Sequence, residues 1–308
     1  MDFELNENQT AILDGLEQLI SSQHVEASKE GVLVAYSAPL DAELAASGFL
    51  DIAREEDFTL LDAALVVERL ARLPVSAEVA FSALVGPLFP ADSVQRPFAL
   101  VSGNPLAPAR FLTEARTLLV DQGHELLVID VDPSRVQHIE SLFAYPYGKL
   151  ASLDGLPLRK MGAELAAAVR RRWRLALAVE GAGLMQSAID TVVDHVTNRF
   201  QFNRPLGSFQ AIQHRLAMAA GKQQSARWLA LRAAWADSEA DCALAAGYVQ
   251  DAIPTLVYDL HQFCGAMGLT LEFPLHFWTY RLKAMLGELG GSSAQARAAA
   301  VATWPDAA

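Results

Sequence analysis

The residue types best suited to bind an anion lie between Asn198 and Leu216. We expect a long helix to end near Arg199, a turn at Pro205 and Gly207, and Ser208 to cap the next helix. Arginines and aromatic side chains at such a corner could hold a partly planar anion, because guanidinium groups pair with phosphates. The same pattern also fits a plain helical hairpin, in which the arginines oppose the helix dipole.

In a second stretch, His261 to His276, a ligand would contact main-chain atoms rather than charged side chains. Gly265 and Gly268 interrupt a helical pattern and would let a ligand approach the main chain closely. Gln262 lies one turn before that break and could donate to a phosphate or a carbonyl oxygen. The alternative is a helix end followed by a turn with no ligand.

Four histidines fall within helical patterns, and no pair has a carboxylate partner at metal-ligand spacing. We predict no metal site, and we expect His214 and His261 to be packed, hydrogen-bonded histidines and not catalysts; the four histidines are His195, His214, His261 and His276. The basic run Arg170, Arg171, Arg172 and Arg174 is typical of a solvated helix face. The sequence contains no P-loop, no GxGxxG, no GxSxG and no Cys/His pair.

These residues lie in or beside segments with helical patterns. Such patterns occupy both the N-terminal and the C-terminal parts of the chain. We expect helices over residues 7–22, 41–47 and 60–73, with a short helix or buried turn over 81–90. Short β-type runs follow at 97–102, 115–120 and 125–131, with a hairpin connection at 121–124, and fade out near 153–155. Helix returns from Arg159, over 165–199, 209–238, 242–265 and 274–289. The predicted fold is mainly α: an N-terminal helical domain (1–92), a short β-domain (93–157) and a C-terminal four-helix bundle (158–308).

Composition indicates the kind of protein and its location but does not indicate its chemistry. The chain has 308 residues, 52% of them hydrophobic, and a formal net charge of -12. Such an apolar share argues against disorder, and the acidic balance argues against nucleic acid as a partner. No apolar run is long enough to span a membrane, and the opening Met1–Glu7 lacks a secretory layout. With only Cys242 and Cys264, we expect a reducing, cytoplasmic location.

Taken together, the two stretches resemble the acyl-CoA dehydrogenase family. Residues 199–216 are similar to the family's R-x-Q-F-G-R-P-I-G-x-F-Q-x-x-Q-H-x-L segment, with Asn203 where the family usually has glycine. Residues 261–274 are similar to its Q-x-x-G-G-x-G-F-T-x-E-x-P segment, with Ala266 and Leu269 as departures. Residues 1–9, 44–50 and 67–72 also resemble the family's N-terminal segments, in the same order.

This resemblance implies a helical, a β and a four-helix domain, with the last mediating dimers and tetramers, and it implies FAD held across a subunit interface. By position, Arg199 and Phe202 correspond to the arginine and aromatic that reach a neighbouring subunit's flavin nucleotide. Gln262 and Gly265 correspond to the glutamine and first glycine that meet the FAD pyrophosphate. An arginine and a glutamine would supply hydrogen-bond donors to a diphosphate in a partly buried interface.

Two departures from the family pattern bear on catalysis. The T-E-P-x-x-G-S-D and W-I-T stretches, which line the flavin ring and the acyl-CoA in the family, are missing from a short β-segment. The family's glutamate of Y-E-G-T-S, which removes the substrate's α-proton, would fall at Leu289 or Gly290. Glu288 is its neighbour, but a shift of one or two helical positions turns a side chain by about 100–200°. Glu180, on the long helix, is a second weak candidate and is expected to be an ordinary surface glutamate.

These losses resemble the short subunits of heteromeric acyl-CoA dehydrogenases of bacterial steroid side-chain degradation. The expected function is α,β-desaturation of an acyl-CoA, with a bulky steroid side-chain thioester as the substrate. The expected assembly is a heterotetramer with a homologous subunit, which supplies the base and most of the acyl-CoA pocket. The family also implies an electron-transfer flavoprotein as electron acceptor. Two alternatives stay open: a stand-alone homo-oligomeric enzyme using Glu288 or Glu180, and a flavin-free scaffold or regulatory homologue.

Overall fold

The computed structural model describes residues 4–23 and 33–307. The expected N-terminal helices are confirmed: α1 Glu7–Ser22, α2 Ala38–Ala46, α3 Leu60–Ala71 and the short α4 Ala80–Leu84. Local chemistry sets their ends, since Asn6 and Gln9 form a capping box at α1 and Gly48 takes a left-handed φ of 76° after α2. Residues 1–3 of the segment that resembles the family's opening lie outside the described ranges.

Two small sheets follow and pack face to face. The strands are β1 Phe98–Ser102, β2 Ala109–Arg110, β3 Thr117–Asp121, β4 Leu126–Asp130, β5 Val136–Ile139, β6 Tyr147–Leu150 and β7 Leu158–Met161. One sheet has the order β1-β3-β4-β7, parallel only between β1 and β3, and the other has the order β2-β6-β5. The predicted hairpin between β3 and β4 is confirmed. The expectation that strands end near 153–155 and helix returns at Arg159 is wrong, because β7 pairs with β4 there.

The central strands are apolar throughout because both of their faces are buried. Along β4, Leu127 and Ile129 face the core between the two sheets, whereas Leu126 and Val128 belong to the larger core shared with the helices. The β-domain is therefore fixed to the helical part by one face of its larger sheet.

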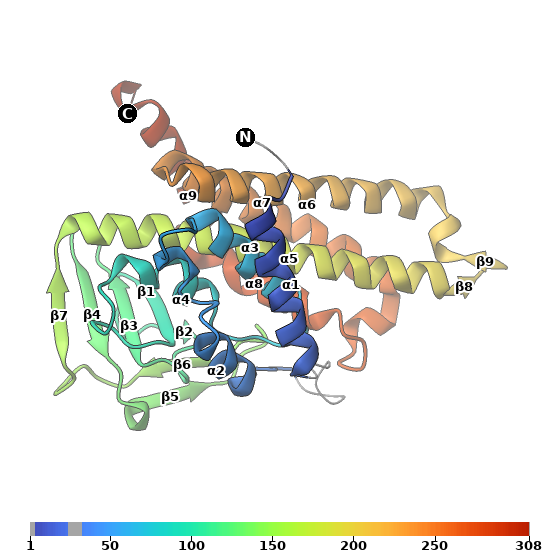
Figure 1. The fold of residues 1–308 in the computed structure, drawn as a ribbon. Coiled ribbons are helices and arrows are strands. Elements are labelled where there is room, and N and C mark those ends of the chain that lie inside the picture. The colour runs from blue at the N-terminus through green and yellow to red at the C-terminus, as the bar shows by residue number, and fades with distance from the viewer. Residues whose placement is uncertain (1–3, 24–32, 308) are drawn as a thin grey trace.

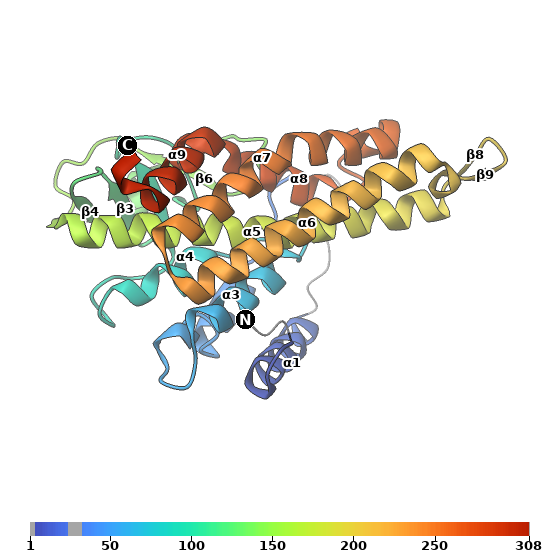
Figure 2. The same cartoon turned by 90° about the horizontal axis from the view of Figure 1, so that it is seen from above.

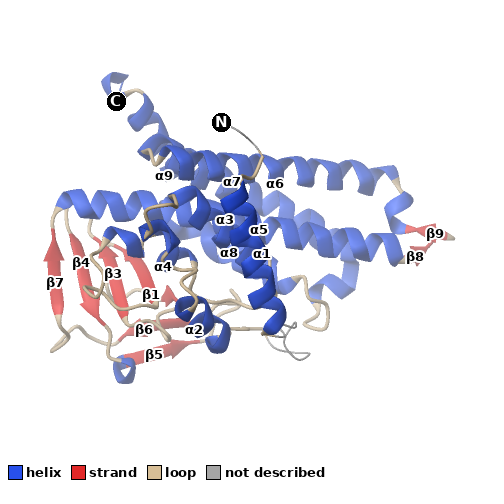
Figure 3. Cartoon of the chain, in the orientation of Figure 1, coloured by secondary structure: helices blue, strands red, loops and turns tan. Residues whose placement is uncertain are grey.

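The C-terminal helices run beside one another, and α5 is the longest (Figures 1 and 3). They are α5 Ala163–Asn198, α6 Gln210–Ala236, α7 Glu239–Cys264, α8 His276–Ala284 and α9 Gly291–Thr303. The β-domain packs at one end of α5, and a hairpin of β8 Phe200–Gln201 and β9 Arg204–Pro205 projects from the other end (Figure 1). The N-terminal helices cover a side of α5 away from α7 (Figure 2).

Two details of the expected bundle need correction. Ser208 does not cap α6, since its hydroxyl donates to Pro205 O and the cap residue is Phe209. The expected fourth helix over 274–289 breaks into α8 and the short segment η6 Met285–Gly290, where Glu288 and Leu289 leave helical geometry. The following α9 was not expected. In the described parts of the chain, no helix is long and apolar enough to cross a membrane.

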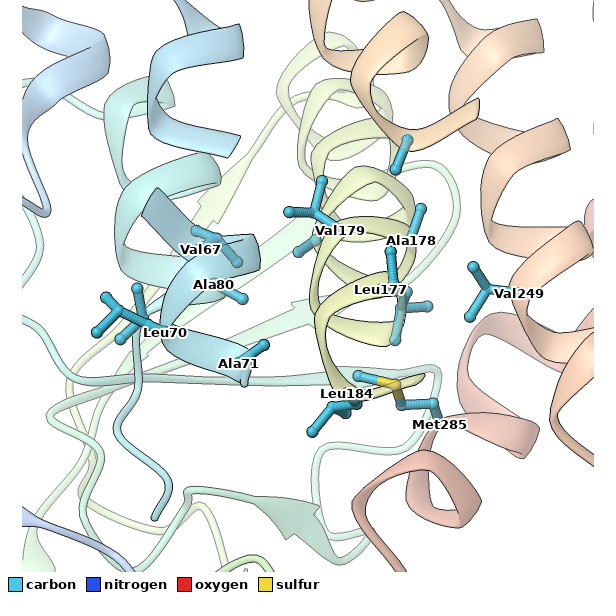
Figure 4. Close-up of a cluster of buried hydrophobic side chains, with 14 of the residues drawn as sticks. Val67, Leu70, Ala71, Ala80, Leu177, Ala178, Val179, Leu184, Val249 and Met285 are labelled. Carbon is cyan, nitrogen blue, oxygen red and sulfur yellow. The ribbon is translucent and has the colours of Figure 1, made fainter. Parts of the chain in front are cut away.

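Close contacts on both sides of α5 depend on glycines. Figure 4 shows the neighbours on the two sides, Ala71 of α3 and Val249 of α7. A Cβ on Gly183 would lie 2.3 Å from the carbonyl oxygen of Glu68 and 2.8 Å from the Cβ of Ala71, both on α3. On the other side, a Cβ on Gly181 would lie 2.5 Å from a methyl group of Val249 on α7. The three helices can therefore approach one another only because these positions lack side chains.

We expect Gly183→Ala to lower the free energy of unfolding by about 1–3 kcal/mol, because the added methyl group meets the backbone of α3, which cannot rotate away. The control is Gly221→Ala on α6, where a Cβ would meet nothing within 4 Å. Alanine there should be neutral or slightly stabilising, since it favours helix over glycine. Urea unfolding followed by circular dichroism would measure both, and equal stabilities would contradict the packing described.

Candidate functional site

The two candidate bases named from the sequence, Glu180 and Glu288, lie together around one buried arginine. Arg110 on β2 reaches Glu180 of α5 (Nη1 to Oε2, 2.6 Å) and Glu288 of η6 (Nε to Oε1, 2.8 Å). Tyr145 donates its hydroxyl to Glu180 (2.7 Å), and Trp173 donates its indole N–H to Glu288 (2.6 Å). These five residues, the Arg110 cluster, join the β-domain to the bundle.

Aromatic rings cover Arg110 at the centre of the cluster, while Glu288 at its edge is half-buried. The guanidinium carbon of Arg110 lies 4.5 Å from the ring centre of Phe81 and 5.2 Å from that of Tyr145. Arg110 is 3% exposed and Glu180 is 7% exposed. The expectation that Glu180 is an ordinary surface glutamate is therefore wrong.

All four carboxylate oxygens of the cluster are engaged. Each oxygen of Glu180 and of Glu288 contacts Arg110, Tyr145 or Trp173. A general base must present a free oxygen within hydrogen-bond distance of the proton that it removes. In this arrangement neither glutamate does so, although burial raises the pKa of Glu288 against the opposing effect of Arg110.

Arg199 and Phe202 lie at the opposite end of α5 from the β-domain. Arg199 ends α5, and the two-residue loop of the β8–β9 hairpin is Phe202-Asn203. Both loop residues have positive φ, 56° and 61°, as a type I′ turn requires. Asparagine tolerates this conformation, whereas phenylalanine rarely adopts it, and Phe202 is 83% exposed. Arg199 is also exposed.

Gln262 and Gly265 lie at the same end of the bundle. They close α7, which runs antiparallel to α6 (Figure 2). Arg215 near the start of α6 forms an ion pair with Asp259, one turn before Gln262. Gln262 and Gly265 are exposed, and Gly265 has a φ of 56° with open space where a Cβ would lie. The structure thus places the four predicted cofactor contacts on one exposed end, away from the Arg110 cluster.

The basic run of α5 is structural and not a solvated face. Arg170 binds Asp121 of the β-domain (2.6 Å), while Arg171 and Arg172 both bind Asp237 after α6 (3.0 and 2.9 Å). Arg174 is buried and donates to Gln295 of α9 (2.7 Å). These arginines hold the β-domain, the end of α6 and α9 against the start of α5.

Of the two histidines expected to be packed, His261 is half-buried and hydrogen-bonded, whereas His214 is exposed, so the expectation is wrong for His214. His276 is buried with its Nδ1 2.8 Å from Phe273 O, and His261 has its Nε2 3.0 Å from the hydroxyl of Thr279. Residues 4–23 and 33–307 contain no group of three His, Cys, Asp or Glu side chains that could hold a metal ion.

We expect stability to fall as the pH drops below the ordinary histidine pKa of 6.5. Burial, assisted by Lys283, lowers the pKa of His261 below that value. From 6.5 down to the lowered pKa, the unfolded chain binds a proton that the folded chain does not, so the folded state loses stability. Thermal unfolding of wild type and His261→Asn between about pH 7.5 and about pH 5 would measure this. The variant should lose less stability on acidification, and identical slopes would contradict the assignment.

Sequence reasoning missed Arg110, Tyr145 and Trp173. Arg110 lies in the short apolar stretch Ala109–Leu112, where a charge would need a buried partner. That isolated charge is the one feature of the sequence that indicates a buried ion pair. It does not show that Glu180 and Glu288 are its partners.

Comparison with known proteins shows which proteins the C-terminal region is similar to. Residues 161–301 match the family model described as acyl-CoA dehydrogenase, C-terminal domain. Among curated proteins, the chain is 35% identical over 123 residues to acyl-CoA dehydrogenase FadE34 and 29% identical over 150 residues to FadE28, both from Mycobacterium tuberculosis. These matches cover 38% and 46% of this chain, but only 17% of FadE34 and 44% of FadE28.

Solved structures extend the similarity in fold over nearly the whole chain. The Tcur3481-Tcur3483 steroid ACAD aligns with a TM-score of 0.75 at 21% identity, covering 98% of this chain and 99% of that chain. The ChsE4-ChsE5 complex of Mycobacterium tuberculosis gives 0.73 at 18%, covering 96% and 97%. A glutaryl-CoA dehydrogenase of Mycobacterium smegmatis in complex with FADH2 gives 0.72 at 15%, covering 99% and 96%. Residues 161–301 of the chain are therefore similar to the C-terminal domain of acyl-CoA dehydrogenases, and nearly the whole chain shares the fold of these solved structures.

Proposed function

We propose that this chain is a subunit of an FAD-dependent acyl-CoA dehydrogenase complex that desaturates an acyl-CoA between its α and β carbons. In this proposal the chain contributes Arg199, Phe202, Gln262 and Gly265 to the FAD of a homologous partner subunit. The partner supplies the catalytic base and most of the acyl-CoA pocket. The substrate class we favour is a bulky steroid side-chain thioester, oxidised in a heterotetramer that passes electrons to an electron-transfer flavoprotein in the cytoplasm.

The observation that carries this proposal is the exposed set of donors at one end of the bundle. Arg199 offers a guanidinium, Gln262 an amide, and Gly265 a main chain that no side chain shields. This donor set fits a diphosphate. Phe202 supports the same reading, because an exposed phenylalanine in a left-handed conformation is uncommon unless function requires it.

FAD, when bound, accepts a hydride from the substrate's β carbon. For this chain, we infer that Arg199 and Gln262 hold the nucleotide's phosphates and that Phe202 covers part of it. Proton removal is assigned to the partner, because the oxygens of Glu180 and Glu288 are already engaged. The names of two similar structures, a steroid ACAD and a two-component complex, favour the heteromeric form over a stand-alone enzyme.

Co-expression with a full-length family member encoded beside it tests the proposal. The two chains should elute from a sizing column as one complex that oxidises acyl-CoA. If the chain never associates with a homologue and never carries FAD, the proposal is wrong and the scaffold or regulatory alternative is favoured.

A further inference from the structure

An open groove lies between α7 and α8, and we call it the α7–α8 groove. It has a volume of about 940 Å³, and Phe143 from the loop between β5 and β6 also lines it. Sites for small molecules typically measure about 300–1,000 Å³. The groove is therefore large enough for a ligand of drug or lipid size.

Its walls are mainly hydrocarbon. Ile253, Val257, Leu269 and Leu286 line the groove, together with the exposed ring of Tyr258. Burying such walls against an apolar ligand is favourable at roughly 25 cal/mol per Å² of surface removed from water. The groove thus fits a ligand with a large apolar body.

Three of its polar side chains lie close together, and Lys283 is the one charged residue among the described residues that line the groove. The rings of His261 and Tyr280 are nearly parallel, 6.2 Å apart, and Lys283 Nζ lies 5.2 Å from the centre of the Tyr280 ring. No aspartate or glutamate is among the described residues that line the groove. In a chain with a net charge of -12, a groove without a carboxylate and with an ammonium group beside it favours an anion.

From this apolar wall and single cationic corner, we propose that the α7–α8 groove binds a hydrocarbon-rich monoanion, such as a long-chain or polycyclic carboxylate. Its apolar body lies along α7, and its anionic group meets Lys283 and the Tyr280 hydroxyl. FAD suits the groove less well, because two phosphates and many hydroxyl groups need more donors than these walls provide. The inference rests on the groove's own lining and not on the proposed flavin contact, although Gln262 and Gly265 also border it.

Glycine substitutions allow a matched test. Gly287 lines the groove, has no positive φ, and would place a Cβ in open space, so Gly287→Phe fills the groove without strain. Gly221→Phe adds the same ring at an equally open position on α6. Lys283→Ala removes the cation, and Lys160→Ala, at an exposed site on β7, makes the same change in net charge. Thermal melts would confirm that each variant is folded.

The experiment titrates the full chain, without a partner, with anilinonaphthalene sulfonate and with the uncharged N-phenylnaphthylamine, following their fluorescence. Gly287→Phe should weaken both probes by at least about tenfold, and Gly221→Phe should weaken neither. Lys283→Ala should weaken the sulfonate by about tenfold and the uncharged probe by less than about twofold, and Lys160→Ala should change neither. Dodecanoate should displace the sulfonate, whereas FAD should not.

The inference is overturned if the two phenylalanine variants bind alike, if Lys283→Ala affects both probes equally, or if FAD displaces the sulfonate and dodecanoate does not. Because no partner is present in the assay, these failures leave the proposed flavin contact untouched. Loss of the complex on co-expression would in turn leave this inference standing.

Discussion

Replacing Arg110 by alanine is expected to lower the free energy of unfolding by about 3–5 kcal/mol. The change leaves the buried Glu180 and the half-buried Glu288 without the cation that both contact. Such a loss is large, since a whole domain is stabilised by only about 5–15 kcal/mol. The β-domain should also detach more easily, because the cluster joins β2 to α5 and η6. Chemical unfolding and hydrogen exchange in β2 would measure the two effects.

The control for Arg110 is Arg159→Ala, which breaks an ion pair between half-exposed side chains. Exposed pairs of this kind contribute about 0–1 kcal/mol. If Arg110→Ala destabilises no more than Arg159→Ala, the cluster is not the buried brace described here. Glu288 would then be free to act in catalysis, as the stand-alone alternative requires.

Replacing Arg199 by alanine in a co-expressed complex is the second change with a large expected effect. A hydrogen-bonded charge of this kind contributes about 1.5–3 kcal/mol, so FAD should dissociate roughly 10- to 100-fold more readily. The chain itself should keep its stability, because Arg199 is exposed and follows the end of α5. Equilibrium dialysis of FAD from the purified complex would measure the change.

Arg297→Ala provides the matched control, since this arginine is exposed on α9, outside the end of the bundle that carries Arg199. It removes the same charge and should leave FAD affinity unchanged. Full retention of FAD by the Arg199 variant would show that the hairpin end of the bundle is not the flavin contact.

Long-range contacts account for most of what the sequence could not predict. The long helices were predictable because apolar residues recur at helical spacing over many turns, as in α5. Strand β7 was not, because Leu158–Met161 is exposed along its whole length and shows no alternation. Helix α9 was hidden in an alanine-rich stretch without a clear apolar face.

Long-range contacts also explain which parts of the candidate site could not be predicted from the sequence. The end of α5 near Arg199 could be predicted because its signals are local. The turn expected at Pro205 and Gly207 lies instead at Phe202 and Asn203, because residues 204–205 form strand β9. The Arg110 cluster joins residues 35 or more positions apart, such as Tyr145 and Glu180, and only the packed fold brings them together. For that reason Glu180 was taken for a surface residue.

The most direct test of the proposed subunit role is the amount of FAD bound by the chain alone and by its complex with a full-length homologue. We predict that the chain purifies alone without flavin and without acyl-CoA dehydrogenase activity, and that the complex carries both. A chain that purifies alone as a yellow, active enzyme would contradict it.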